Sequence, residues 1–106
     1  MFFRVRAQLR QDTAAELRRK LTDGTIQSQK PDGQEIVDSM NRAVVTKSGE
    51  IEWSEVCYCD KPLGHERATV YDHHFGALTT QLVDGYQEHQ GRPFMAYLDE
   101  ICARRQ

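Results

Sequence analysis

An alternation of apolar and polar residues at the start of the chain restricts the fold more than any other sequence feature. Every second residue from Met1 to Leu9 is apolar, whereas Arg4 and Arg6 stand between them. A period of two is typical of a strand with one face in the core and the other face in water. We therefore predict a strand over residues 2–9, in a sheet whose second face is wet.

The next segments have helical spacing. Thr13 and Glu16 have the separation of a capping box at a helix start, and Asp32 with Glu35 repeats this arrangement. The polar residues between these two signals indicate a loop. The predicted helices cover residues 14–22, 34–42 and 65–75, and a last helix opens with Pro93 at its first position.

The centre of the chain has the composition of strands. Residues 44–46 and 51–59 flank Lys47-Ser48-Gly49, and the glycine favours a tight hairpin turn. Residues 77–83 fit either a strand or a longer helix, and their threonines and valine favour the strand. Residues 85–91 are a polar connection.

This order of elements predicts an α+β fold with a mainly antiparallel sheet of three to four strands and helices packed on one face. A chain of 106 residues supplies one small domain, residues 1–106. The expected core residues are Phe3, Val5, Leu17, Leu21, Met40, Val45, Leu98 and Ile101.

Large apolar residues are scarce in this chain. Leu, Ile, Val and Phe together make up only 22 of its 106 residues. In addition, residues 1–30 carry a formal charge of +4 although the whole chain carries −2. A small core and a charge separated along the sequence both favour self-association, so we expect a homodimer that forms through charge or through an apolar surface near Trp53.

Neither a membrane span nor a secretion signal is expected. No apolar run approaches the roughly 18 residues that cross a bilayer, and the start of the chain lacks the apolar segment of a signal peptide. The three cysteines are an odd number, which does not suggest a disulfide framework. We expect a cytoplasmic protein with reduced thiols and no membrane partner.

The ionisable residues that follow the hairpin are the candidate site. Cys57 and Cys59 precede a segment rich in histidine and acidic residues, and such groups can serve as metal ligands or as acids and bases near neutral pH. The candidate catalytic residues are Cys57, Cys59, His65, Glu66, His73 and His74.

Spacing argues against a metal ion at these residues. On an extended strand the thiols of Cys57 and Cys59 would lie about 6 to 7 Å apart. On one helix His65 and His73 would lie about 12 Å apart along the axis. The segment starting at His65 also resembles the first half of a zinc-protease helix motif, but Thr69 stands where the second histidine belongs. The sequence thus predicts buried cysteines and no metal or cofactor.

The arginines of the first strand could follow a nucleic-acid backbone, but the sequence pI of about 6.1 does not favour that partner.

The first hypothesis is a non-enzymatic module that self-associates and binds a partner, with no small-molecule ligand specified. The alternative is a small enzyme or metal-binding protein built on the cluster of Cys57, Cys59, His65, His73 and His74.

Overall fold

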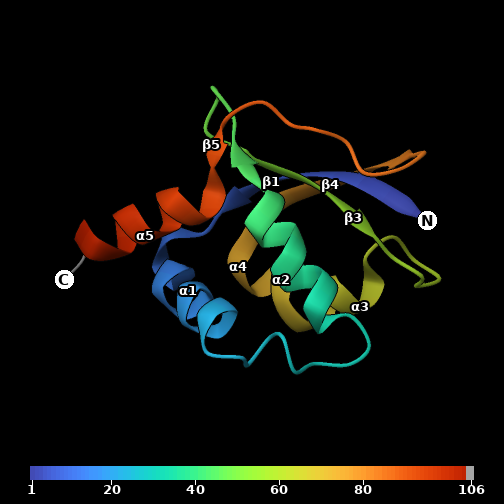
Figure 1. Ribbon diagram of the computed structural model, residues 1–106, viewed down its shortest axis with the longest axis horizontal. Helices are drawn as coiled ribbons and strands as arrows, with labels where there is room; N and C mark the ends of the chain where they lie inside the picture. The colour runs from blue at the N-terminus through green and yellow to red at the C-terminus, as the bar shows by residue number, and fades with distance from the viewer. Residues whose placement is uncertain (105–106) are drawn as a thin grey trace.

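The computed structural model describes residues 1–104 and contains a five-stranded antiparallel sheet with helices packed on one face (Figure 1). The strands are β1 (Phe2–Leu9), β2 (Val44–Val45), β3 (Ile51–Val56), β4 (Phe75–Val83) and β5 (Arg92–Pro93), in the spatial order β4-β1-β3-β2-β5. The α+β prediction is confirmed. The sheet has one strand more than predicted because the two residues before the last helix pair with β2.

Helices cover a single face of this sheet. They are η1 (Gln11–Thr13), α1 (Ala14–Thr22), α2 (Gly33–Arg42), α3 (Gly64–Glu66), the π-helical η2 (Arg67–Tyr71), α4 (Asp72–His74) and α5 (Phe94–Arg104). The three short elements α3, η2 and α4 form the helical segment that was predicted over residues 65–75, except that Phe75 already belongs to β4. Pro93 lies in β5, just before α5, and not at the first helical position.

The core lies between the sheet and the helices. Val5 of β1 is paired with Trp53 of β3, and both side chains are fully buried. The expected core residues are buried except Val45, which is only partly covered because β2 lies near the edge of the sheet. Because Trp53 is covered by Tyr71 and Phe75, the expectation of a self-association surface near Trp53 is wrong.

Three local predictions are wrong for identifiable reasons. Thr13 and Asp32 make no side-chain capping bond; Thr13 instead contacts His74, and Asp32 pairs with His65. The long strand ends at Val56 and not at residue 59, because the backbone N–H of Cys59 donates to the Sγ of Cys57 (3.3 Å) and not to a neighbouring strand.

Residues 84–91 form a strap across the open face of the sheet (Figure 1). The strap joins β4 at one edge of the sheet to β5 at the opposite edge, so it has to cross the strands between them. His89 and Gln87 fasten it to β3, and Tyr86 packs edge-on against Phe2 (ring centroids 5.0 Å apart). The polar residues Glu52 and Ser54 of β3 are buried beneath the strap.

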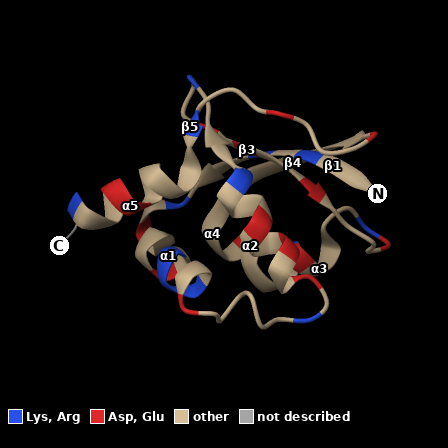
Figure 2. Ribbon diagram, in the orientation of Figure 1, with Lys and Arg blue, Asp and Glu red and all other residues tan. Residues whose placement is uncertain are grey.

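Ion pairs join the basic start of the chain to acidic residues elsewhere. Arg4 and Arg6 pair with Glu52, and Arg18 pairs with Asp99. Basic and acidic residues are therefore mixed over the ribbon and do not form two separate sides (Figure 2). Within residues 1–104, no helix is both long and apolar enough to cross a membrane.

Candidate functional site

Most of the candidate residues meet beside the end of β3. A cavity of about 240 Å³, which we call the cysteine pocket, lies between this end, the start of α2 and α3. Its lining residues are Pro31, Asp32, Glu35, Val56, Cys57, Tyr58, Cys59 and Glu66.

Glu66 accepts hydrogen bonds from both thiols of the pocket. Its Oε1 lies 3.2 Å from the Sγ of Cys59 and 3.7 Å from the Sγ of Cys57. One ligand atom from each of the three residues can be chosen so that all lie within 4.8 Å of one another. The thiols are closer together than expected because Cys57 and Cys59 lie in a turn after β3 and not on the strand.

The chain turns sharply to bring α3 back to the cysteines. Leu63 is fully buried and has a left-handed backbone conformation, with φ of 54°. The N–H of Gly64 donates to the carbonyl of Lys61 (3.0 Å), which closes the turn. Burial of the Leu63 side chain offsets the cost of its unfavourable φ and places Glu66 against the thiols.

Asp32 and His65 form a second pair beside Glu66. The Nδ1 of His65 lies 2.6 Å from the Oδ2 of Asp32. Asp32, His65 and Glu66 also offer one ligand atom each within 4.8 Å of one another. Asp32 Oδ1 is buried and has no hydrogen-bond partner within residues 1–104. Glu66 thus belongs to two groups of metal-ligand residues.

Glu55 is a further buried carboxyl group near the pocket. Its Oε1 accepts hydrogen bonds from the Trp53 indole (3.0 Å) and from the Tyr71 hydroxyl. Burial, with a smaller effect of Glu66, raises the pKa of Glu55 well above its ordinary value. The burial of Glu55 thus favours the protonated form of its carboxyl group over the charged form.

Burial is also the main reason why the pKa of the Cys57 thiol is raised to about 12, and Glu66 adds to the effect. A thiol nucleophile needs a lowered pKa, provided by a nearby cation or a helix start. Cys57 lies against a carboxylate instead. This environment of Cys57 disfavours thiol catalysis by the protein alone. A bound cation would stabilise the thiolate form of Cys57.

The other two candidate histidines lie outside the cysteine pocket. The exposed His73 bonds to the carbonyl of Ala68 (3.2 Å), and the buried His74 bonds to the hydroxyl of Thr13 (2.9 Å). The predicted cluster therefore keeps His65 and loses His73 and His74. Asp32 was missed as a site residue because its position before a helix resembled a cap.

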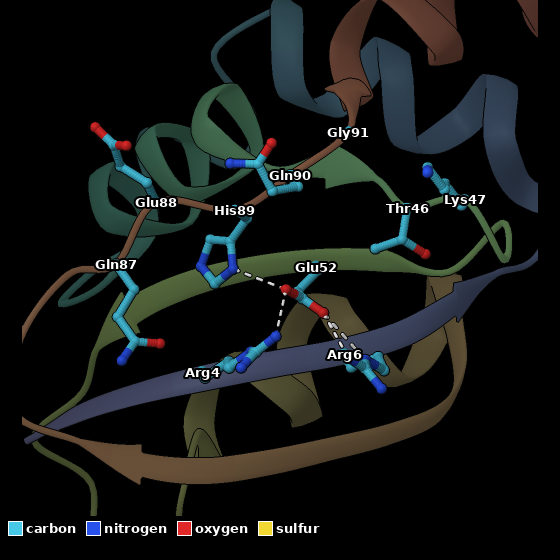
Figure 3. A pocket seen from close by; sticks show the side chains of 10 residues that line it. All are labelled: Arg4, Arg6, Thr46, Lys47, Glu52, Gln87, Glu88, His89, Gln90 and Gly91. Atoms are coloured by element: carbon cyan, nitrogen blue, oxygen red, sulfur yellow. Dashed lines mark hydrogen bonds and ion pairs between the residues drawn. The ribbon is translucent and has the colours of Figure 1, made fainter.

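A second cavity, of about 680 Å³, opens on the other face of the sheet beside the strap (Figure 3). Its floor is Glu52, whose carboxylate accepts hydrogen bonds from Arg4 (2.8 Å), Arg6 (2.9 Å) and His89 (2.9 Å). These bonds outweigh the effect of burial and lower the pKa of Glu52 to about 2.

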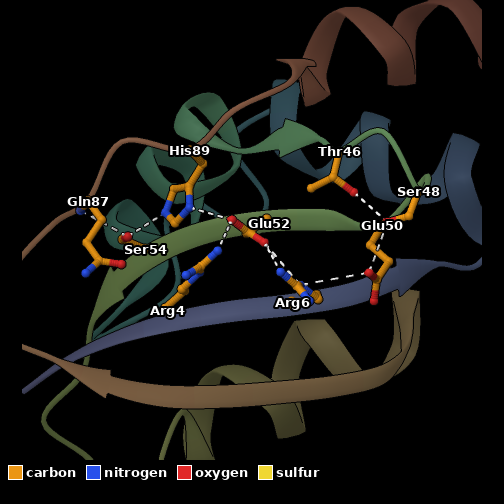
Figure 4. A network of polar contacts seen from close by, with 9 residues as sticks. All are labelled: Arg4, Arg6, Thr46, Ser48, Glu50, Glu52, Ser54, Gln87 and His89. Atoms are coloured by element: carbon orange, nitrogen blue, oxygen red, sulfur yellow. Dashed lines mark hydrogen bonds and ion pairs between the residues drawn. The ribbon is translucent and has the colours of Figure 1, made fainter.

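Ser54, His89 and Glu52 have the connectivity of a serine–histidine–acid triad (Figure 4). The Ser54 Oγ lies 2.7 Å from His89 Nε2 and accepts the N–H of Gln87 (3.1 Å). However, Ser54 is only 2% exposed, and the strap covers its hydroxyl. The arrangement satisfies buried polar groups and fastens the strap, and it gives no substrate access to the serine.

Comparisons with known protein families, with curated proteins and with solved structures find no match to this chain.

Proposed function

We propose that the protein binds one thiophilic divalent metal ion, zinc, in the cysteine pocket. The observation that carries this proposal is the convergence of the two thiols and the Glu66 carboxylate within 4.8 Å of one another. Thiolates, imidazoles and carboxylates are the ligands of protein zinc sites, and thiolates favour zinc over magnesium or calcium.

The distances within the pocket fit such an ion. Zinc bound at about 2.3 Å from sulfur and about 2.0–2.2 Å from oxygen or nitrogen keeps its ligands roughly 3.3 to 3.8 Å apart. Glu66 Oε1 lies 3.2 Å from one sulfur and 3.7 Å from the other. The expectation of no metal was based on an extended strand through Cys59, and that strand ends at Val56.

His65, which belongs to the neighbouring group with Asp32 and Glu66, is the proposed fourth protein ligand. Its ring does not share one 4.8 Å group with the two thiols, so it has to turn toward the ion on binding. Asp32 bonds to the Nδ1 of His65, and a carboxylate that holds one imidazole nitrogen leaves the other nitrogen free to bind a metal. The residues that hold the ion are then Cys57, Cys59, His65 and Glu66, with Asp32 as the orienting group. Both thiols lose a proton on binding, so zinc affinity rises with pH.

Titration of the metal-free, reduced protein with Zn²⁺ or Co²⁺ alone tests this proposal. We expect one ion per chain, and the sulfur-to-cobalt charge-transfer absorption of the Co²⁺ form reports thiolate ligands. Cys57→Ser and Cys59→Ser should each weaken that absorption and together abolish it, whereas Asp32→Asn should weaken affinity by about 10- to 100-fold and keep the absorption.

Two matched controls separate this site from general thiol or imidazole binding. Cys102→Ser removes a buried thiol on α5, and His73→Asn removes an exposed imidazole outside the pocket. Both variants should bind metal as the wild type does. Absence of stoichiometric binding, or binding that survives Cys57→Ser unchanged, would show that the pocket is not a metal site.

A second proposed property is self-association as a homodimer, which a specific feature of the sheet favours. β4 is an edge strand of nine residues, and none of them is charged. Exposed edges of this kind pair readily with other strands. Sedimentation at micromolar concentration tests the proposal, with about twice 12.2 kDa as the expected mass and a monomer as the contrary result.

The two thiols of the proposed zinc site favour a cytoplasmic location, because free thiols require a reducing compartment. We do not propose a nucleic-acid partner, since Arg4 and Arg6 are paired with Glu52.

A further inference from the structure

We propose that two copies of this chain associate by antiparallel pairing of β4 with β4 of the second copy, about a two-fold axis at Thr80. The inference rests on the proposed homodimer and adds the surface, the register and the contacting residues. It turns the five-stranded sheet of one chain into a ten-stranded sheet shared by two.

The outer edge of β4 is open to a partner. β1 pairs with the inner side of β4, and no strand within residues 1–104 pairs with its outer side (Figure 1). Natural sheets usually protect such an edge with charged side chains, proline or a very short strand. The sequence FGALTTQLV from Phe75 to Val83 offers none of these protections.

A bulge sets the length of the segment that can pair regularly. The register between β1 and β4 shifts between Arg6 and Gln8, and Ala77 has a positive φ of 51° at this shift. A bulge increases the local twist and interrupts the ladder. Regular pairing with a second copy is therefore confined to residues 78–83.

One register within this segment is self-complementary. Thr80 and Leu82 pair with Val5 and Phe3, so both face the helical side of the sheet. With Thr80 opposite its own copy, Leu78 of each chain meets Leu82 of the partner, and Thr79 meets Gln81. Leu82 is 58% exposed in the single chain, so this register covers the most exposed apolar side chain of β4.

The electrostatics of the edge permit this pairing. A two-fold axis brings each residue close to a copy of itself, so any charge near the axis would be repelled by its twin. Because β4 has no charged residue, no charge of the strand meets its own copy. The arginines beside Thr80 are paired within the chain: Arg4 and Arg6 with Glu52 on one face, and Arg67 with Asp72 on the other. Backbone hydrogen bonds, the threonine contacts and two leucine pairs then contribute to association.

Sedimentation of the wild type and of Leu82→Lys tests the proposal. The substitution places a charge on an exposed position at the edge and should raise the dimer dissociation constant by about tenfold or more. Gln87→Lys, which adds the same charge on the exposed strap, is the matched control and should dimerise as the wild type does.

Three outcomes are distinguishable. A dimeric wild type with a weakened Leu82→Lys variant and an unchanged control supports the β4 interface. A dimeric wild type whose affinity Leu82→Lys leaves unchanged rejects this interface while the homodimer stands. A monomeric wild type rejects both.

Disulfide trapping provides a measurement that does not depend on weakening the dimer. Thr80→Cys places two thiols opposite each other at the axis, where antiparallel neighbours approach closely enough for a disulfide. We expect a covalent dimer on mild oxidation, above the background of the three native cysteines, and no such gain for Gln87→Cys. Failure of Thr80→Cys to cross-link a dimeric protein would reject the register.

Discussion

His74 is a buried imidazole of α4 that bonds to Thr13 of η1, and it couples the stability of the fold to pH. Burial lowers its pKa to about 4, and the nearby cations Lys20 and Arg10, together with His73, act in the same direction. Glu16 opposes this effect. The side chain is 1% exposed, so the neutral form is the one that packs.

We predict that His74 makes the protein less stable as the pH falls from about 6.5 to about 4. Over this range the unfolded chain binds a proton at His74 and the folded chain does not, so the free energy of unfolding decreases. A shift from 6.5 to about 4 corresponds to roughly 3 kcal/mol at the acidic end.

Urea unfolding of the wild type and of His74→Gln at several pH values measures this contribution. The difference in unfolding free energy between the two proteins should change across the range, whereas His73→Gln, which removes one of the smaller causes of the lowered pKa, should alter the wild-type profile much less than His74→Gln does. Parallel profiles for wild type and His74→Gln would contradict the assignment.

Residue types predicted three of the eight residues that line the cysteine pocket, namely Cys57, Cys59 and Glu66. His65 was also predicted, and it lies beside the pocket in a group with Asp32 and Glu66. Asp32 is more than thirty residues away from His65, and a lone aspartate before a helix is typical of a cap. Only the tertiary contact between Asp32 and His65 shows that Asp32 is a partner of the histidine and not a helix cap.

At the scale of elements, the strongly periodic segments were predicted well. β1 and α1 have the predicted bounds because one face of each is apolar, although Thr13 does not cap α1 as predicted. The end of β3 could not be predicted, because Cys57, Tyr58 and Cys59 continue its β-rich composition and only the local bond to the Cys57 sulfur stops the strand. Polar residues 84–91 have no periodicity that would predict a strap.

We predict that His89→Ala loosens the strap without disrupting the sheet. The substitution removes the hydrogen bonds from His89 to Ser54 and Glu52. A buried polar group that loses its hydrogen-bond partner lowers the free energy of unfolding by about 1 to 3 kcal/mol. The sheet pairs Arg4 and Arg6 with Glu52 independently of His89.

Amide hydrogen exchange locates this effect. The N–H of Gln87, which donates to Ser54, should exchange faster in His89→Ala, while amides between β1 and β3 keep their relative protection. Gln90→Ala, an exposed neighbour, serves as the control. Uniform loss of protection over the whole sheet would mean that the strap is an integral part of the fold and not a separable element.

For the molecule as a whole, the sequence indicated a charge separation that the fold removes. The basic first thirty residues include β1 and α1, and both are paired with acidic residues from later in the chain. Charge patterns along a sequence do not specify which segments become neighbours in space. The expectation that charge drives self-association therefore loses its main support, and the uncharged edge of β4 takes its place.

We predict that dimer formation depends little on salt. Screening weakens interactions between exposed charges over about 10 Å at 0.1 M salt, but pairing through β4 brings no charged side chain of that strand to the axis. The dissociation constant measured by sedimentation should change by less than about threefold between 0.05 M and 0.5 M sodium chloride, because no ion pair forms across the β4 edge for salt to screen. An interface built from Arg–carboxylate pairs would weaken steadily over the same range. Such weakening, in a protein that dimerises, would place the interface on a charged surface and not on β4.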